Sequence, residues 1–467
     1  MPPRIIPILG RLRQDIAATI SRETIEEGCR EVKHSWRKRV LDPATTVWLF
    51  VLQVLHGNTA CSHVVHFGQW TFTVSAYCQA RKRLPLALFH WLLEKTAATF
   101  RSTTAATSRW RGHRVWLVDG SGFSMPDTPE LQEHFGQPGG QRKGCGFPVA
   151  KWLALFDLTT GMLLRSATAP LRTHDMSQAP AVSCELEPGD LVLGDRGFCS
   201  YAHLALLARR GLHAVFRIHQ RQIVDFTPGR PHKGKGKGKG KGKGKGKGKG
   251  KGKGRRGSKD LPGMPRSRWV LAQGESDQVV IWCKPKRKPT WMTAEEYQAL
   301  PGELTVRELR YRVDVPGYRV REVTLATTLL DAAAYPAREL ADLYYRRWQV
   351  EVNFRHIKTT MGMDVLRCET VEGVLKELAV FCLAYNLVRS AMVESAAVQG
   401  VAADRISLVD TVRWLIGVEE APVSVLVVNP ERPGRVDARV KKRRPKQYMR
   451  MTKPRSVLRK QLLTKNF

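Results

Sequence analysis

Residues 344–358 read YYRRWQVEVNFRHIK, and their pattern decides the interpretation of the whole chain. Polar and apolar residues recur with a helical period, which predicts a helix from about residue 336 to residue 359, with Pro336 in its first turn. At about 100° per residue, four polar side chains fall within an arc of about 60°, beside an apolar stripe. These four are Tyr344, Arg347, Glu351 and Lys358. The helix is therefore expected to pack one face into a core and to present a polar edge at its rim.

The polar edge has two interpretations. In the simpler one it is a solvated stripe with a Glu–Lys ion pair, but Glu351 and Lys358 are seven residues apart, whereas local pairs are three or four apart. In the other, a single acid among basic neighbours is a metal-binding carboxylate flanked by phosphate-binding groups. The second interpretation needs further acids from elsewhere in the chain.

Two aspartates could supply those acids. Asp119 ends the β-rich run HRVWLVD at residues 113–119, and Asp195 ends the run DLVLGD at residues 190–195. An unpaired carboxylate at the end of a buried strand is costly, although either aspartate alone could also be a turn former. Two such carboxylates side by side would repel unless a cation lay between them, and hard oxygen ligands select Mg²⁺ or Mn²⁺.

Changes of composition along the chain predict five regions. The first reads as short helices with basic faces, which suit a DNA-binding domain, although an ordinary helical bundle has the same pattern. Strands, helices and a β-rich insertion follow, and a basic region comes last. The predicted boundaries are 1–109 for the helical domain, 110–220 and 326–398 for two parts of an α/β core, 221–325 for the insertion, and 399–467 for the basic C-terminal region.

The charge balance points to a polyanion. The chain has 77 Lys and Arg against 42 Asp and Glu, a formal net charge of +35. Residues 233–254 are eleven Lys-Gly pairs, which we expect to form a mobile cationic linker, and without their eleven charges the chain still carries +24. Residues 431–467 hold 14 basic and 2 acidic residues and include KKRRPK. Such an excess fits counterion release from phosphates, although a merely soluble cationic surface is the alternative.

Length and composition exclude several classes of protein. A chain of 467 residues predicts about two to four domains, and 42% apolar residues with 12 Trp argue against a disordered chain. Nine Cys without paired spacing argue against a disulfide framework and a zinc site. No apolar run reaches the ~20 residues that cross a bilayer, and the first residues lack a signal-peptide layout. We therefore expect a cytoplasmic, nucleoid-associated protein with no membrane partner.

The spacing Y-x₂-R-x₃-E-x₆-K at residues 344–358 is the point at which the chain resembles a known family. It resembles the DDE transposases of bacterial insertion sequences, in their insertion-sequence-four branch. Three further segments also look like this branch, so the resemblance covers nearly the whole chain. These segments are VDGSGFSMPDTPELQEHFGQPGGQRKGCGFPVAKW from residue 118, LVLGDRGF around Asp195, and RRPKQYMRMTKPR near the C-terminal end.

The resemblance implies a fold and a catalytic site. The fold would be α/β, with an RNase H-like catalytic core interrupted by the β-rich insertion, a helical N-terminal DNA-binding domain and a basic C-terminal tail. Asp119, Asp195 and Glu351 would form the catalytic and metal-binding triad, holding two Mg²⁺ ions with Mn²⁺ as a substitute.

The same resemblance implies the DNA contacts. Tyr344, Arg347 and Lys358 would grip the phosphate near the cleaved end, Arg347 as a planar fork and Lys358 as a point charge. Arg196 is a further DNA-binding candidate that could equally be part of a structural ion pair. His174 and Asp175 precede a helix, where Asp175 is expected as an N-cap rather than as a fourth metal ligand.

The implied activity is cut-and-paste transposition. The enzyme would bind terminal inverted repeats, nick the DNA, form a hairpin end and transfer the 3′-OH strand to target DNA, as a homodimer when DNA is bound. A flipped base could stack on Trp269, Trp282 or Trp291, each of which could instead be a core residue. The alternatives are an RNase H-like nuclease without strand transfer, an inactivated or domesticated DNA-binding derivative, and an RNA-binding protein.

Overall fold

The computed structural model describes residues 5–67, 71–104, 109–230, 264–313, 322–417 and 451–464. The Lys-Gly array and the KKRRPK segment lie outside these residues, so the predictions about them stay predictions. The chain divides into two compact units. The first comprises Met1–Leu186, Asp190–Leu193 and Tyr345–Phe467, and the second comprises Glu187–Gly189 and Gly194–Tyr344.

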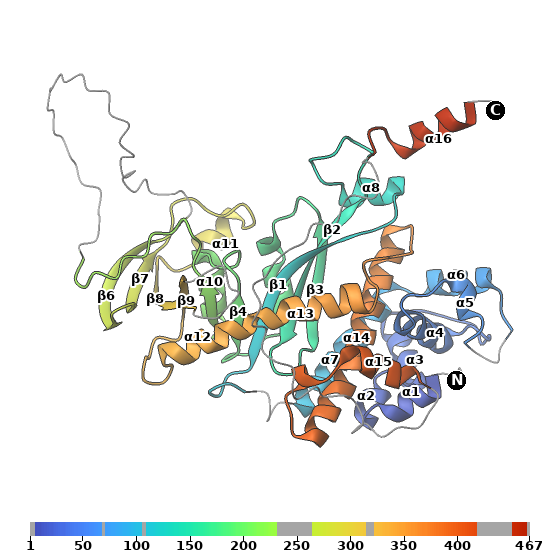
Figure 1. Ribbon diagram of the computed structural model, residues 1–467, viewed down its shortest axis with the longest axis horizontal. Coiled ribbons are helices and arrows are strands. Elements are labelled where there is room, and N and C mark those ends of the chain that lie inside the picture. Colours follow the sequence, from blue (N-terminus) through green and yellow to red (C-terminus); the bar gives the residue numbers. More distant parts are fainter. Residues whose placement is uncertain are drawn as a thin grey trace. The chain divides into compact units, whose positions relative to one another are not determined.

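The first unit opens with helices whose starts are capped by side chains. Ser21, Asp42 and Thr73 each accept a hydrogen bond from a backbone N–H three residues on, which satisfies one of the unpaired donors at a helix start. This confirms the helical prediction for the N-terminal region (Figure 1). The helices are α1 (Ile5–Arg11), α2 (Gln14–Ala18), α3 (Arg22–Glu31), α4 (Pro43–Leu55), α5 (Cys61–Val64), α6 (Val74–Arg83) and α7 (Leu86–Thr103).

One long helix joins these N-terminal helices to the strands. Helix α14 (Val371–Gln399) packs against α4, α7 and strand β3 (Leu163–Pro170). It ends at Gly400 in the left-handed conformation that glycine adopts without strain. Along its length most residues are buried, which is why it shows no amphipathic period. The short helices η4 (Ala403–Arg405) and α15 (Leu408–Ile416) follow it. None of the described helices is long and apolar enough to span a membrane.

Three antiparallel strands and β4 form the sheet of the first unit. Strands β2 (Val149–Asp157) and β3 (Leu163–Pro170) pair antiparallel as a hairpin, and β1 (Val115–Ser124) pairs antiparallel with β2. Strand β4 (Leu191–Gly194) follows β1 in the order β3-β2-β1-β4. Trp152 and Phe156 of β2 meet Phe354 edge-on, so a later helix covers this face of the sheet.

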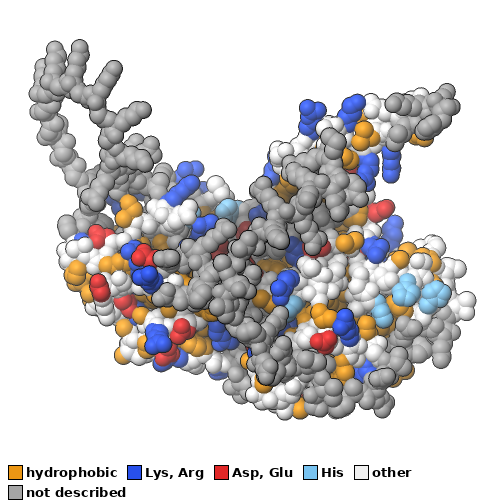
Figure 2. Space-filling model, viewed as in Figure 1, with side chains coloured by type: hydrophobic (Ala, Val, Ile, Leu, Met, Phe, Trp, Pro, Cys, Tyr) orange, Lys and Arg blue, Asp and Glu red, His pale blue; other side chains and the backbone are white. Residues whose placement is uncertain are grey.

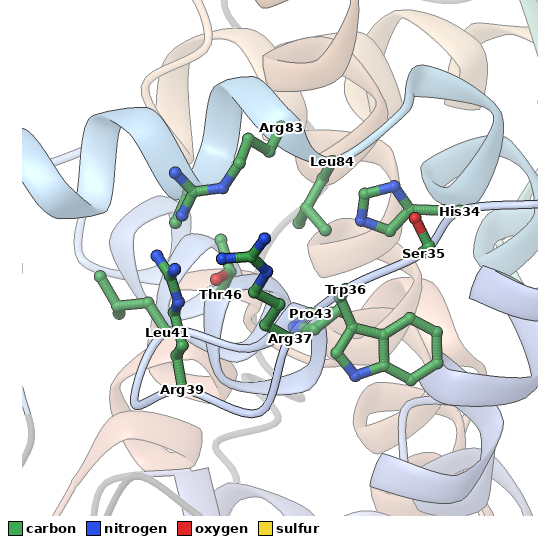
Figure 3. Close-up of a pocket in the computed structure, with 11 residues that line it drawn as sticks. His34, Ser35, Trp36, Arg37, Arg39, Leu41, Pro43, Thr46, Arg83 and Leu84 are labelled. Carbon is green, nitrogen blue, oxygen red and sulfur yellow. The ribbon is translucent and has the colours of Figure 1, made fainter.

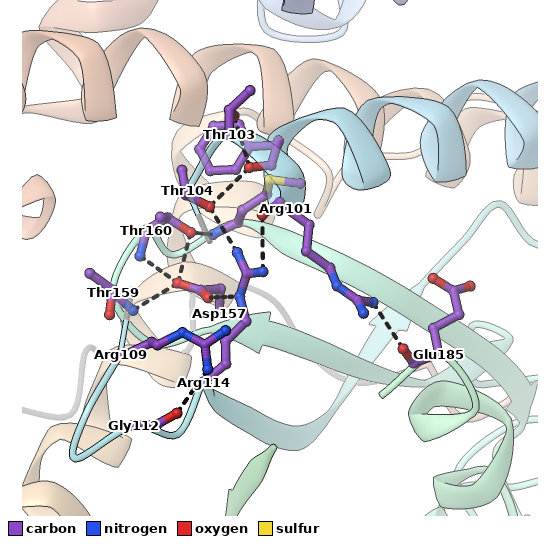
Figure 4. A network of polar contacts seen from close by, with 12 residues as sticks. Arg101, Thr103, Thr104, Arg109, Gly112, Arg114, Asp157, Thr159, Thr160 and Glu185 are labelled. Atoms are coloured by element: carbon purple, nitrogen blue, oxygen red, sulfur yellow. Dashed lines mark hydrogen bonds and ion pairs between the residues drawn. The ribbon is translucent and has the colours of Figure 1, made fainter. Parts of the chain in front are cut away.

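A buried ion pair joins β1 to the end of β2 (Figure 4). Arg114 Nε donates to Asp157 Oδ2 at 3.2 Å, and the other guanidinium nitrogens donate to the Arg101 carbonyl and to Thr104 Oγ1. Asp157 Oδ1 also accepts from the backbone N–H and the hydroxyl of Thr160. Because each partner has several hydrogen bonds, the pair can remain charged away from water.

The second unit is built on a five-stranded segment of sheet. Its strands follow the order β5-β9-β8-β7-β6, and each described pairing is antiparallel. Inside it, the fully buried Arg307 contacts Asp277 with both ends of its guanidinium, at 2.8 and 2.5 Å. Its elements are α10 (Tyr201–Arg209), β5 (His213–Arg217), β6 (Arg266–Gly274), β7 (Asp277–Cys283), α11 (Ala294–Gln298), β8 (Glu303–Arg312), β9 (Glu322–Thr327) and α12 (Ala337–Tyr345).

The mixed α/β class is confirmed, and all nine cysteines are free thiols, as their spacing predicts. The described part of the basic tail forms α16 (Arg455–Thr464), from which Lys and Arg side chains stand out into solvent (Figure 2). The remaining short elements of the first unit are α8 (Pro129–Phe135), η1 (Asp175–Ser177), α9 (Ala179–Ser183), η2 (Arg346–Trp348), α13 (Gln349–Arg355) and η3 (His356–Thr360).

Candidate active site

Asp119 lies in the middle of a strand, and the prediction that it ends one is wrong. Strand β1 continues to Ser124, with Asp119 opposite Ala154 and Ser124 opposite Val149. The polar sequence GSGFS after Asp119 hides this continuation, because pairing with β2 holds the strand rather than its own β-propensity. The Asp119 Oδ1 atom accepts the N–H of Gly120 at 2.8 Å, and its side chain is about one-fifth exposed, at 21%.

The predicted helix over residues 336–359 is present from Ala337 to Thr360, but it is not one regular helix. After α12, the residues Arg346–Trp348 form a tighter 3₁₀ turn, and after α13 the residues His356–Thr360 form a wider π turn. A constant rotation of about 100° per residue is therefore wrong for this segment. The 3₁₀ turn rotates the following side chains further around the helix axis than an α-helix does, and the π turn rotates them less. Short π segments inside helices are frequent at functional sites.

Arg347 connects two of the predicted catalytic acids. Its Nη1 atom lies 3.4 Å from Asp119 Oδ2, and its Nη2 atom lies 3.3 Å from Glu351 Oε1. Helix α13 packs on β1, which explains how residues more than two hundred positions apart meet. The Asp119 side chain is 21% exposed and that of Glu351 is 41% exposed, so both carboxylates are within reach of solvent.

Lys358 contacts β1 at the residues that follow Asp119 and Gly120. Its Nζ atom donates to the Gly122 carbonyl at 2.8 Å and to Ser121 Oγ at 3.2 Å, and Asp364 Oδ1 is 3.8 Å away. The π turn places it there. Arg347 and Lys358 therefore contact β1 at Asp119, Ser121 and Gly122, and Glu351 is joined to the strand through Arg347.

Asp175 approaches the same strand from another loop. Its carboxylate accepts from Lys151 Nζ at 3.1 Å, and a Cβ added to Gly120 would lie 3.1 Å from its Oδ2 atom. The expectation that Asp175 is an N-cap is wrong. His174 is the capping residue, because its Nδ1 accepts the N–H of Met176, and Asp175 is the first residue of the short helix.

The remaining predicted residues belong to the second unit. Asp195 directly follows β4, as the sequence predicts, and its Oδ1 accepts the N–H of Gly197 at 2.7 Å. Arg196 is exposed and donates to Gln220 Oε1 at 2.9 Å, a neutral partner rather than an ion pair. Tyr344 is buried near the end of α12, with 8% of its surface exposed. The meeting of Asp195 with the other two acids stays a prediction.

The carboxylate oxygens of Asp119 and Glu351 in the first unit are of the kind that binds a divalent cation. Among the residues that the structure describes, no group of three or more His, Cys, Asp and Glu side chains lies close enough to hold a metal ion. Two carboxylates nevertheless converge on one cationic group, the guanidinium of Arg347. Carboxylate oxygens are the ligands that Mg²⁺ and Mn²⁺ prefer.

Comparison with known proteins decides the family. The family model described as "Transposase DDE domain" matches residues 110–387, more than half of the chain. The chain belongs to this family. It is 25% identical over 375 residues to the transposase InsG for insertion sequence element IS4 of Escherichia coli, covering 77% of this chain and 72% of that protein. This confirms the resemblance to the insertion-sequence-four branch.

A solved structure is also similar at low identity. The piggyBac transposase synaptic complex with hairpin DNA aligns with a TM-score of 0.40 and 10% identity, over 89% of this chain and 80% of that one. The chain is thus a DNA transposase of the DDE class by family membership. Family membership favours DNA over RNA as the partner of the chain's positive charge.

The structure also bears on the prediction that a tryptophan of the transposase stacks on a flipped base. Trp282 is fully buried, and its indole N–H donates to Glu308 Oε1 at 2.8 Å, so it is a core residue and cannot stack on a base. Trp269 and Trp291 are partly exposed. The Nε1 atom of Trp269 is buried without a hydrogen-bond partner among the described residues.

Sequence reasoning missed several residues around the transposase's acids. They are Gly120 and Ser121 on β1, Lys151 on β2, and Asp364 after the π turn. The run DGSG at residues 119–122 carried a signal, because a glycine inside a strand often marks the close approach of another group. Lys151 and Asp364 carried no local signal, since their positions depend on tertiary packing.

Proposed function

We propose that this transposase moves an insertion sequence by a cut-and-paste route. It would bind the terminal inverted repeats, nick the DNA, form a hairpin end and transfer the 3′-OH strand to target DNA. The observation that carries the proposal is Arg347, which holds Asp119 and Glu351 together across a separation of 232 positions in the sequence. A carboxylate pair bound to a shared cation, in a protein of this family, supports phosphoryl-transfer chemistry.

Asp195 completes the proposed triad. Connectivity supports this, because Asp195 comes two residues after Leu193, the last residue of β4 in the first unit, and β4 follows β1 in the strand order. The three acids would hold divalent ions, for which we propose two Mg²⁺ with Mn²⁺ as a substitute. When bound, such ions activate the attacking oxygen and stabilise the negative charge that develops on the phosphate.

The chain's own residues position the DNA. We propose that the Arg347 guanidinium releases one of its two carboxylates and binds a DNA phosphate with its planar fork. Lys358 would supply a point charge beside β1. Tyr344 and Arg196 would extend this contact in the second unit. Water would attack the first phosphodiester, the bond to the 3′ oxygen would break, and the freed 3′-OH would be the next nucleophile.

The proposed architecture follows from the same family. Residues 110–220 and 326–398 would form an RNase H-like core, 221–325 the insertion, 1–109 the DNA-binding domain and 399–467 a basic arm on DNA. Two copies would pair the two transposon ends as a homodimer. Because chromosomal DNA would be both donor and target, the enzyme would act at the nucleoid in the cytoplasm.

The test is cleavage of a supercoiled plasmid that carries the element with its flanking DNA. We expect Asp119→Asn, Asp195→Asn and Glu351→Gln each to reduce Mg²⁺-dependent cleavage by at least about a thousandfold, while binding to the ends persists. Glu133→Gln removes an exposed acid of α8 outside the site and should cleave normally.

The products separate transposition from simple hydrolysis. Hairpin ends and joined target DNA are expected, whereas a nuclease would stop at linear products. Normal cleavage by Asp195→Asn would remove that residue from the triad. Cleavage products that never join a target would favour the nuclease.

A further inference from the structure

A cavity of about 520 Å³ lies among the N-terminal helices, far along the chain from the catalytic acids. Its wall comes from three segments: the loop after α3, the first turn of α4 and the end of α6 (Figure 3). The lining residues include three arginines, one histidine and one tryptophan, and none of them is acidic. These are Arg37, Arg39, Arg83, His34 and Trp36.

Among the residues that the structure describes, the three arginines gather without an acidic partner. Figure 3 shows their guanidinium groups on one side of the cavity, around Thr46. Within the described part of the chain, Arg37, Arg39 and Arg83 form no ion pair. Like charges gathered in this way repel one another unless an anion lies between them. On a solvated surface, arginine side chains would point away from one another. The arginine cluster therefore resembles an anion-binding site.

The loop that carries Arg37 and Arg39 is anchored at both ends. At its start, Lys33 adopts the left-handed conformation at φ 55°, and the His34 N–H donates to the Cys29 carbonyl at 2.8 Å. At its end, Asp42 caps α4 through the N–H of Thr45 and also binds Arg22. The acid nearest in sequence is thus already engaged away from the cavity. A backbone held at both ends presents its side chains with less loss of entropy on binding.

Positive charge also dominates the aromatic side of the cavity. The His34 ring lies nearly parallel to Trp36, with an angle of 15° and centroids 6.5 Å apart. Burial, and then the charges of Lys376 and Arg83, lower the pKa of His34. The neutral imidazole and the partly exposed indole offer flat surfaces next to the arginine fork, which suits the sugar and base beside a phosphate.

We propose that this cavity binds a backbone phosphodiester of the transposon DNA, with Arg37, Arg39 and Arg83 on the phosphate oxygens and Trp36 against the adjoining nucleotide. The proposal rests on the proposed function, because it needs DNA as the partner. It adds a specific contact point to the N-terminal domain. A planar guanidinium group can donate two parallel hydrogen bonds to one phosphate. Because such contacts have a fixed geometry, this cluster holds the protein in one register on the duplex.

The experiment measures the binding of a short fluorescent duplex of mixed sequence to the full-length protein over a range of salt. Each phosphate contact contributes about 0.9 to the slope of log affinity against log salt. The double variant Arg37→Ala/Arg39→Ala should lower this slope by about 2 and weaken binding by about tenfold or more. Arg37→Lys keeps the charge and should retain the slope with weaker binding, since the fork is lost.

Two controls accompany the variants. Arg209→Ala removes the same charge from the exposed end of α10, in the second unit and outside the proposed DNA-binding segments, and should leave the slope unchanged. Trp36→Phe should retain more affinity than Trp36→Ala, because an aromatic surface remains. An unchanged slope in the double variant, or an equal loss in Arg209→Ala, would overturn the proposal.

Inorganic phosphate separates the two sources of the anion. One outcome would be that inorganic phosphate stabilises the wild-type protein against heat but not the double variant, while the salt slope of DNA binding is the same in both. In that case the cavity is a site for the free ion and the proposed DNA contact is wrong. Cleavage by the catalytic variants is a separate readout. Loss of cleavage in Asp119→Asn with an unchanged slope in Arg37→Ala/Arg39→Ala would reject this inference alone.

Discussion

Arg347 contacts two carboxylates with one guanidinium, and this double contact has a consequence for metal binding. In the free protein the arginine occupies oxygen atoms that a divalent ion would also use. Replacing it with alanine leaves Asp119 and Glu351 without a shared cation, and their repulsion then favours a bound ion.

We therefore expect Arg347→Ala to bind Mg²⁺ about tenfold more tightly in calorimetric titration, while its affinity for cleaved DNA ends falls. Arg346→Ala is the matched control, because Arg346 is the adjacent exposed arginine. Weaker Mg²⁺ binding in Arg347→Ala would show that the arginine supports the carboxylates rather than competing for them.

Gly120 is a second residue whose identity the tertiary structure explains. A Cβ at this position would lie 3.1 Å from Asp175 Oδ2, whereas a Cβ at Gly122 would meet nothing closer than the Ala150 carbonyl at 3.5 Å. We expect Gly120→Ala to cost about 1 kcal/mol of unfolding free energy and to slow cleavage, while Gly122→Ala is neutral or slightly stabilising. Urea unfolding of the two variants compares these sites on the same strand.

At the scale of the elements, the buried pair Arg114–Asp157 holds the start of β1 to the end of β2. Removing one partner leaves an uncompensated charge, so Asp157→Ala should lower the free energy of unfolding by about 3–5 kcal/mol. Arg413→Ala breaks an exposed pair with Asp410 and should cost less than about 1 kcal/mol. Similar losses in the two variants, measured by denaturant unfolding, would mean that the buried pair is no stronger than a surface one.

The loop after β4 depends on a buried histidine. His203 packs against Phe216, and its Nδ1 lies 3.0 Å from the Phe198 carbonyl, in the turn that begins at Asp195. Burial lowers the pKa of His203 from 6.5 to about 4. Between these values the unfolded chain binds a proton that the folded chain does not, so stability is fully present above pH 6.5 and is lost as the pH falls toward 4.

We expect the free energy of unfolding to fall by up to about 1.4 kcal/mol per pH unit in this window from His203 alone. His203→Gln keeps a donor for the Phe198 carbonyl and should show a shallower pH dependence. His356, whose pKa burial lowers to about 3, should maintain part of the slope in the variant. An unchanged pH profile in His203→Gln would assign the whole dependence to other groups.

At the scale of the whole molecule, the net charge of +35 governs binding to DNA of any sequence. Deletion of residues 233–254 removes eleven positive charges without removing any residue of the proposed site. The deletion should weaken salt-sensitive binding to mixed-sequence DNA and leave cleavage of the proper ends nearly intact. Filter binding at several salt concentrations and plasmid cleavage measure the two effects. Loss of cleavage would show that the array has a specific task.

Sequence alone determined the class of the chain and most element positions, and it supplied the three candidate acids. The short N-terminal helices, the strand that precedes Asp195 and the helical segment of Glu351 lie close to where local patterns predict them. These features depend on period, caps and turns, which act between neighbouring residues. The spacing of Tyr344, Arg347, Glu351 and Lys358 likewise identified the family before any contact was visible.

Only the tertiary structure decided where Asp119 lies within β1, how the helix of Glu351 departs from a regular period, and which side chains surround them. Strand β1 continues through GSGFS because β2 pairs with it, and Lys358 reaches Gly122 because a π turn faces that strand. Such contacts join residues far apart in the chain. Their free energy comes from packing and hydrogen bonds that no local pattern encodes.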